Sequence, residues 1–309
     1  MLRKTAIMKT FRLLVTLALL ALLWRAVDGP AAMDLVLGAD PAWLLAAVLA
    51  LNAQTALSAM RWRLTARGLG QTITLGRAIR EYYLSQIVNQ SLPGGVLGDA
   101  GRAVRARHEA GLKRAGQAVV FERLAGQLAL FGVTGAAVLL VWIGQGGTTL
   151  PDWVLRLVAL TGGMLLVAGV ILWAISRSAH VWGRHVREWF AAFAVSVLAP
   201  DVLPRQIILS LATTALNLLA FAICARATGT TLPLTAIMII VPLILLTMLI
   251  PISVSGWGLR EGAAAALFPV IGASATQGFA ASFAFGLMFL VSVLPGVVFL
   301  WIQPRRQSA

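Results

Sequence analysis

The chain has 309 residues, of which 59% are hydrophobic and only 12% are charged, and its mean hydropathy is +0.87. An ordinary soluble domain has about 25% charged residues, so most of the surface of this protein is not adapted to water. The composition excludes a sizeable soluble domain and predicts a single all-α polytopic membrane domain over residues 1–309, in which each crossing needs about 20 apolar residues.

The net charge of +14 does not indicate a nucleic-acid-binding protein. Lys and Arg lie in short clusters between apolar runs, which is typical of cytoplasmic loops beside a bilayer. The sequence has no basic domain with interleaved aromatic residues that could hold a nucleic acid. We expect the basic loops to face anionic lipid headgroups of a bacterial inner membrane, with the N-terminus in the cytoplasm.

Cys224 is the only cysteine, so no internal disulfide can form and no zinc site can rest on cysteines. The three histidines lie in polar connections and lack the other ligands of a metal site. A Gly-x-x-x-x-Gly-Lys-Ser/Thr motif is also absent from the sequence. We therefore expect no metal, no cofactor and no direct drive by ATP.

The chain begins with two predicted spans, residues 11–27 and 41–60. The first resembles a signal sequence, but no small-x-small cleavage site follows it, so we expect an uncleaved helix. Five arginines then mark a cytoplasmic stretch: Arg61, Arg63, Arg67, Arg77 and Arg80.

A short interrupted segment follows near residues 81–102. It is apolar in part but too short to cross a bilayer, and basic residues flank it on both sides. The chain therefore returns to the side that it left, which predicts a re-entrant or interfacial helix with a broken tip. The predicted break contains Pro93, Gly94, Gly95 and Gly98.

The next predicted spans are residues 118–143, 153–175, 204–226 and 232–250, with an amphipathic interfacial helix at 188–198. A second interrupted segment lies near residues 251–271, and the last span is 279–302. The second break contains Pro251, Gly256, Gly258 and Gly262. Arg305 and Arg306 favour a cytoplasmic C-terminus, in which case residues 263–271 complete a crossing and the total is about eight. The total is seven, with the C-terminus outside, if these residues only dip into the membrane.

Paired interruptions in the two halves of a membrane protein point to a transporter's binding site. The predicted substrate-binding residues are the ionisable side chains at or near the breaks: Asp99, Arg102, Glu122, Arg123, Arg260 and Glu261. Arginine suits bidentate contact with phosphate, and the acids would orient the arginines. We expect one network of all six, with Arg260 and Glu261 diverging toward partners elsewhere because they are adjacent on a helix.

Simpler interpretations stay open for these features. Glu122 and Arg123 could form a structural pair at the interface, and the breaks could be ordinary loops at the membrane surface. Asn52, Gln54 and Asn217 lie inside apolar spans, where polar side chains favour contacts between helices over contact with substrate.

Three stretches carry a resemblance to a known family: Leu92-Pro93-Gly94-Gly95-Val96-Leu97-Gly98-Asp99-Ala100-Gly101-Arg102-Ala103, Phe121-Glu122-Arg123-Leu124, and Pro251-Ile252-Ser253-Val254-Ser255-Gly256-Trp257-Gly258-Leu259-Arg260-Glu261-Gly262. They resemble the flippase-like membrane domain family, also called the lysylphosphatidylglycerol synthase transmembrane region. The resemblance implies about eight spans with two re-entrant elements. The chain resembles a standalone family member without an aminoacyl-transferase domain, so we expect it not to synthesise lysylphosphatidylglycerol.

The leading hypothesis is a lipid translocase that is not an enzyme and moves anionic phospholipid or polyprenyl-phosphate lipids between leaflets. One alternative is a membrane enzyme on lipid-linked substrates with Asp99 or Glu261 as base, although no activated nucleophile is evident. Another is a non-catalytic membrane partner of a lipid or glycan synthase. The sequence leaves the lipid, the direction, the coupling, the pathway and the oligomeric state open.

Overall fold

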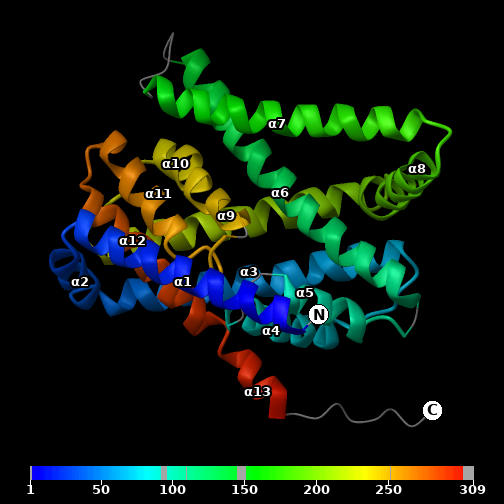
Figure 1. Ribbon diagram of the computed structural model, residues 1–309, viewed down its shortest axis with the longest axis horizontal. Helices are drawn as coiled ribbons and strands as arrows, with labels where there is room; N and C mark the ends of the chain where they lie inside the picture. Colours follow the sequence, from blue (N-terminus) through cyan, green and yellow to red (C-terminus); the bar gives the residue numbers. More distant parts are fainter. Residues whose placement is uncertain (1, 92–95, 109, 145–150, 251, 302–309) are drawn as a thin grey trace.

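The computed structural model describes residues 2–91, 96–108, 110–144, 151–250 and 252–301 (Figure 1). Throughout these residues the regular secondary structure is helical, and no strand occurs among them. The predicted all-α polytopic membrane fold is therefore confirmed.

Five helical segments within the described ranges are long and apolar enough to cross a membrane. They are α3 (Pro41–Gly68), α6 (Gly111–Gly144), α7 (Asp152–Arg177), α9 (Leu203–Ala227), and the run Ala275–Trp301, which contains α12 (Ala275–Ser292) and α13 (Pro295–Trp301). A sixth span results if the bent pair of α1 (Leu2–Ala26) and α2 (Gly29–Leu37) counts as one. The expected total of about eight stays a prediction.

The bend between α1 and α2 explains why the first predicted span ends near residue 27. The two helices meet at 97°, and Asp28 between them adopts a left-handed backbone with φ of 55°. Its carboxylate accepts a hydrogen bond from the Ala31 backbone N–H at 3.3 Å, which caps α2. Asp40 caps α3 in the same way through the Ala42 N–H at 2.8 Å.

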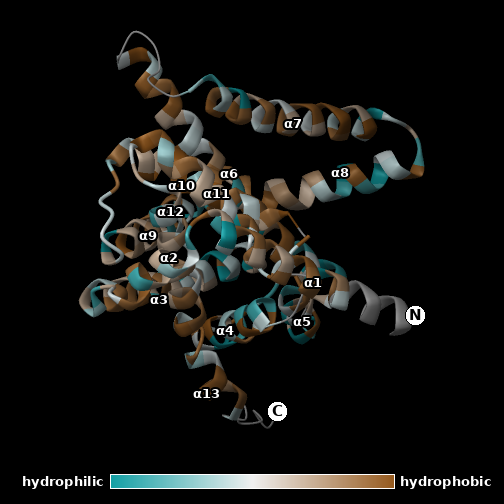
Figure 2. Ribbon diagram, turned by 60° about the vertical axis from the view of Figure 1, so that its left-hand side comes forward, coloured by the Kyte–Doolittle hydropathy of each residue, from teal (hydrophilic) through white to brown (hydrophobic). Residues whose placement is uncertain are grey.

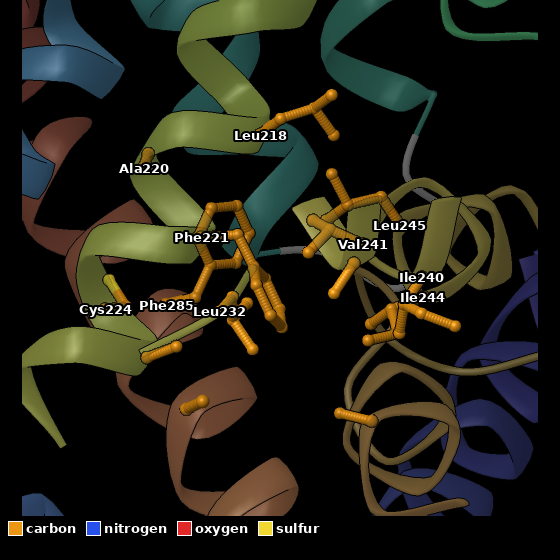
Figure 3. Packing of buried hydrophobic residues seen from close by; sticks show 14 of the residues in the cluster. Leu218, Ala220, Phe221, Cys224, Leu232, Ile240, Val241, Ile244, Leu245 and Phe285 are labelled. Carbon is orange, nitrogen blue, oxygen red and sulfur yellow. The ribbon is translucent and has the colours of Figure 1, made fainter. Parts of the chain in front are cut away.

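The apolar core lies where α3, α9, α10 (Leu234–Leu246) and α12 pack together. Phe221 of α9 and Phe285 of α12 have ring centroids 5.4 Å apart, and Val241 and Leu245 of α10 lie beside them (Figure 3). By contrast, most of α7 lies apart from this core in Figure 1, with only its start at Val154 packed into it, and Figure 2 shows the helix apolar along most of its length. A helix that is apolar all round and still exposed is adapted to a lipid environment.

The first interrupted segment forms a helical hairpin of α4 (Leu75–Ser91) and α5 (Leu97–Arg105), which pack against each other. Gly98 was expected in the break but lies inside α5. Its missing side chain lets α5 approach α4, because a Cβ there would collide with the Ser85 carbonyl oxygen. Pro93, Gly94 and Gly95 lie outside the described residues.

The second interrupted segment lies between α10 and α12. A 3₁₀ turn (Thr247–Leu249) ends the apolar helix, and α11 (Leu259–Leu267) and a second 3₁₀ turn (Phe268–Ile271) precede α12. Gly256 and Gly258 have φ of 80° and 84°, a left-handed backbone that favours glycine at these turns. Gly262 lies within α11 and not at the break, because Gly258 already caps that helix. Pro251 is outside the described residues.

Two shorter elements complete the chain between α7 and α9. Helix α8 (Val181–Phe193) continues into a five-residue π-helix (Ala194–Leu198). The amphipathic helix expected at 188–198 therefore starts earlier in the structure.

Candidate functional site

Arg102 lies at the centre of the first charged cluster and is fully buried. Its Nη2 is 3.1 Å from Asp99 Oδ1 and 3.3 Å from Glu122 Oε2, so one guanidinium bridges two carboxylates. The rings of Trp62 and Tyr82 lie 4.6 Å and 4.5 Å from its guanidinium carbon. Such a charge, held by acids and aromatic faces, has no surface left for a ligand.

Arg61 completes this cluster, although the sequence analysis placed it in a cytoplasmic stretch. Its Nη2 and Nε lie 2.5 Å and 3.2 Å from Glu122 Oε1, and its Nη1 donates to Thr213 at 2.9 Å. Helix α3 continues past the predicted end of the span to Gly68, which carries Arg61 into the interior. The position of Arg61 directly after the apolar run was the sequence signal that could have predicted its burial.

Arg123 is the accessible arginine of the cluster. Its Nη2 is 2.8 Å from Asp99 Oδ2, yet 44% of its side chain is exposed, against 0% for Arg102. Asp99 also accepts hydrogen bonds from Ser85 at 2.9 Å and from Asn89 at 3.3 Å. The guanidinium of Arg123 can therefore meet a ligand while Asp99 keeps its other donors.

The charges of this cluster do not balance. Three arginines (Arg61, Arg102 and Arg123) face two acids (Asp99 and Glu122), which leaves one net positive charge. Because a surplus charge is costly away from water, a bound anion beside Arg123 would stabilise the arrangement.

The second cluster is balanced and closed. Glu261 Oε1 lies 2.5 Å from Arg260 Nη2 and 3.0 Å from its Nε, and Ser282 donates to the same oxygen at 3.1 Å. The other carboxylate oxygen accepts the Gly258 N–H at 2.7 Å. Trp257 packs on the Arg260 guanidinium, with the ring centroid 5.1 Å from its central carbon.

The expectation that Arg260 and Glu261 diverge is therefore wrong. The capping contact folds Glu261 back toward Gly258, and this brings its carboxylate within reach of the long Arg260 side chain. The expected single network is also wrong, because no hydrogen bond or ion pair among the described residues joins this pair to the first cluster.

Both interrupted segments line one cavity of about 690 Å³. Asn89 and Gln90 of α4 and Asp99 of α5 come from the first segment, and Ser253 and Ser255 come from the second. The Ser255 hydroxyl donates a hydrogen bond to Gln90 Oε1, which joins the two segments directly. The segments therefore share a site even though their charged clusters are separate.

The rim of the cavity is apolar and accessible. The residues that line it include five exposed aliphatic side chains: Val96, Val120, Leu124, Leu249 and Ile250. Arg123 and Asp99 lie among them. A polar interior beside an exposed apolar rim suits an amphiphile, whose chains can follow the rim while its headgroup enters.

The sequence matches the model of the lysylphosphatidylglycerol synthase TM region over residues 10–296. The chain belongs to this family. The match confirms the resemblance drawn from the three motif stretches, and it includes both charged clusters and the cavity. The protein is thus an integral membrane protein of a lipid-related family and interacts with membrane lipids. No curated protein matches the sequence.

The cavity of this lysylphosphatidylglycerol synthase TM region contains polar residues that the sequence analysis missed or assigned differently. Six side-chain amides line it: Gln54, Gln86, Asn89, Gln90, Gln127 and Asn217. Gln54 and Asn217 were expected only to hold helices together. Gln127 lies one helical turn after Arg123, at the i, i+4 spacing of a shared helix face, which was a usable signal.

Among the described residues, no group of three or more His, Cys, Asp or Glu side chains lies close enough together to hold a metal ion. The expectation of a protein without a metal or cofactor stays a prediction. The accessible chemistry of the cavity is that of one guanidinium, one carboxylate and neutral hydrogen-bonding groups.

Proposed function

We propose that this protein is a lipid translocase of the bacterial inner membrane, with its N-terminus in the cytoplasm. It would pass anionic phospholipid or polyprenyl-phosphate headgroups between leaflets without ATP and without catalysing a reaction. The observation that supports this most is the shared cavity, in which the accessible Arg123 lies next to an exposed apolar rim.

The phosphate of the headgroup binds to the Arg123 guanidinium. Arginine offers two parallel N–H donors to a phosphate, and such charge-assisted bonds are about twice as strong as neutral ones. Asp99 then keeps its contacts with Arg102, Ser85 and Asn89, so it is not left as an unpaired acid. The acyl chains remain along the apolar rim, which avoids the cost of moving them through a polar site.

The buried arginines have a positioning role. Arg102 and Arg61 hold Glu122 between α3, α5 and α6, and this fixes the helix turn that presents Arg123. Arg260 does not line the cavity: its guanidinium carbon lies behind the wall, 5.3 Å from the ring of Phe285, and its pairing with Glu261 is separate from the headgroup site.

Movement between leaflets requires the cavity to open to each side in turn. The contact between Ser255 and Gln90 joins the two interrupted segments, so this contact must change as they move apart. Energy would come from the lipid gradient or from a coupled ion.

A vesicle assay tests the proposal. The purified protein is reconstituted with phosphatidylglycerol that carries a fluorescent acyl chain, and dithionite quenches the outer leaflet. We expect wild-type protein to bring inner-leaflet lipid quickly to the outer leaflet, where dithionite quenches it. Arg123→Gln should lower the rate of this movement about 10- to 100-fold, the effect expected from the loss of one charge-assisted hydrogen bond.

Arg226→Gln is the matched control. Arg226 is an exposed arginine on α9, with its guanidinium carbon 4.5 Å from the Trp43 ring, and it does not line the cavity. Its replacement should leave the rate unchanged. Failure of folded wild-type protein to move phosphatidylglycerol or any other anionic lipid, with an imposed ion gradient as well as without one, would contradict the proposal and favour the enzyme or partner alternatives.

A further inference from the structure

The neutral polar wall of the cavity is not needed to bind a phosphate. Arg123 supplies the positive charge, whereas the six amides and the two serines supply uncharged donors and acceptors. An amide side chain offers two N–H donors and one carbonyl oxygen, a pattern that matches alcohol groups. We therefore expect this wall to contact the part of the lipid headgroup that lies beyond the phosphate.

Several of these groups lack partners. Gln54 Oε1, Gln127 Oε1, Asn217 Oδ1 and Ser253 Oγ are buried and make no hydrogen bond within the described residues. Buried polar atoms are nearly always paired in folded proteins, so four such atoms around one cavity are candidates for contact with a bound ligand or with water. They come from α3, α6, α9 and the second interrupted segment, so they surround the cavity.

The acids of the first charged cluster, of which only Asp99 lines the cavity, have no capacity for a cationic headgroup. Asp99 already accepts from Arg102, Arg123, Ser85 and Asn89. Glu122 is fully buried beneath Arg61 and Arg102. An ammonium group in the cavity would meet the surplus positive charge and no free carboxylate, which disfavours its binding.

We infer that the cavity selects an anionic lipid whose headgroup beyond the phosphate is uncharged and rich in hydroxyls, such as a glycerol or sugar phosphate. This inference deepens the proposed function, on which it rests for the movement of the lipid. The amides bind the hydroxyls while Arg123 binds the phosphate. The exposed apolar rim identifies the occupant as a lipid and not as a free polyol phosphate.

Two lipids of equal charge test the inference directly. Phosphatidylglycerol and phosphatidylpropanol differ only by two hydroxyls, and phosphatidylethanolamine adds an ammonium group. Binding to the purified full-length chain is measured by native mass spectrometry, and movement by the dithionite assay. We expect phosphatidylglycerol to exceed phosphatidylpropanol by about tenfold or more in both, as two hydrogen bonds predict, and phosphatidylethanolamine to be the poorest.

Substitutions in the wall identify the residues responsible. Gln127→Leu combined with Asn217→Leu should reduce the preference for phosphatidylglycerol to about twofold or less, since the unpaired amides are gone. The control is Gln71→Leu, because Gln71 is also a buried amide without partners but lies outside the cavity. This variant should keep the wild-type preference.

The outcomes separate the inference from the proposed function. Equal binding of phosphatidylglycerol and phosphatidylpropanol by wild type would overturn the inference even if both lipids move. A preference in binding without any movement would support the inference and contradict the translocase. Binding of free glycerol phosphate as tight as that of phosphatidylglycerol would overturn the lipid as occupant.

Discussion

The two charged clusters follow similar sequence patterns, a Pro-Gly break and then an acid and an arginine, but they differ in structure. Around Arg102 the positive charges exceed the negative ones, and Arg123 is accessible from the cavity. Around Arg260 one arginine pairs with one acid, and the pair is closed by Ser282 and Trp257. The same residue types after a break therefore form different arrangements, and only the first cluster has a surplus positive charge with an exposed arginine.

The largest expected effect is the loss of Glu122. Glu122→Gln leaves Arg61 and Arg102 buried without their shared acid, and breaking a buried pair in this way costs roughly 3–5 kcal/mol. We expect a large drop in the unfolding temperature of the protein in detergent, together with loss of lipid movement.

Glu261→Gln provides the matched change in the closed cluster. Glu261→Gln removes the acid of one buried arginine, Arg260, whereas Glu122→Gln removes an acid that two buried arginines share. Glutamine at position 261 can also still accept the Gly258 N–H, so the loss of stability should be smaller. If Glu261→Gln destabilises the protein as much as Glu122→Gln does, the two clusters are equivalent and the comparison fails.

Alanine substitutions at two glycines, Gly98 and Gly286, distinguish an effect on lipid movement from an effect on stability. In Gly98→Ala the new methyl group would collide with the Ser85 carbonyl oxygen, so α5 must shift and carry Asp99 with it. In Gly286→Ala it would collide with Arg260 Nη2 and the Trp257 ring, at a cost of about 1–3 kcal/mol. Per folded molecule, we expect the first variant to lose lipid movement and the second to retain it, measured in the same vesicles.

Ser255 allows a smaller change in the contact between the interrupted segments. Its backbone has a left-handed φ of 51°, and its hydroxyl donates to Gln90. Ser255→Ala loses the hydrogen bond and keeps the unfavourable backbone, whereas Ser255→Gly relieves the backbone. Thermal unfolding should therefore rank Ser255→Ala below Ser255→Gly by about 1 kcal/mol, and the reverse order would show that the left-handed backbone is not a source of strain.

The smallest effect concerns the exposed pair of Lys113 and Glu188, 2.7 Å apart. The hydrogen bond and charge of Lys113 lower the pKa of Glu188 below its ordinary value of 4.5. Because the pair is exposed, its contribution to stability is too small to measure by unfolding temperature; it is present above pH 4.5 and is lost as pH falls through the lowered pKa. Glu188→Gln should change neither lipid movement nor unfolding temperature at neutral pH, and a clear loss of either would contradict this assignment.

The sequence predicted the membrane fold and both interrupted segments, because apolar runs, basic loops and Pro-Gly breaks are local signals, and the resemblance of three motif stretches indicated the family. It did not predict that α3 extends far enough to bury Arg61, since helix ends are poorly marked where charged residues follow an apolar run. The pairing of Arg260 with Glu261 depends on a cap at Gly258 that folds one side chain back.

The amide wall was missed for a different reason. Gln54, Gln127 and Asn217 lie on three different helices, in largely apolar stretches that also contain other polar residues. Such a residue serves a helix contact as well as a cavity, and only the packing of α3, α6 and α9 decides between these roles. Polar residues that converge from distant segments cannot be recognised from one sequence by spacing alone.

The most direct test of the account compares the two clusters in one assay. Phosphatidylglycerol movement is measured in vesicles with Arg123→Gln and with the double variant Arg260→Gln/Glu261→Gln, which removes the closed pair without leaving a single charge. After correction for folded protein, we expect the first to lose about 10- to 100-fold in rate and the second to stay within about threefold of wild type. A full rate with Arg123→Gln, or a loss confined to the double variant, would contradict the assignment of the headgroup site to Arg123.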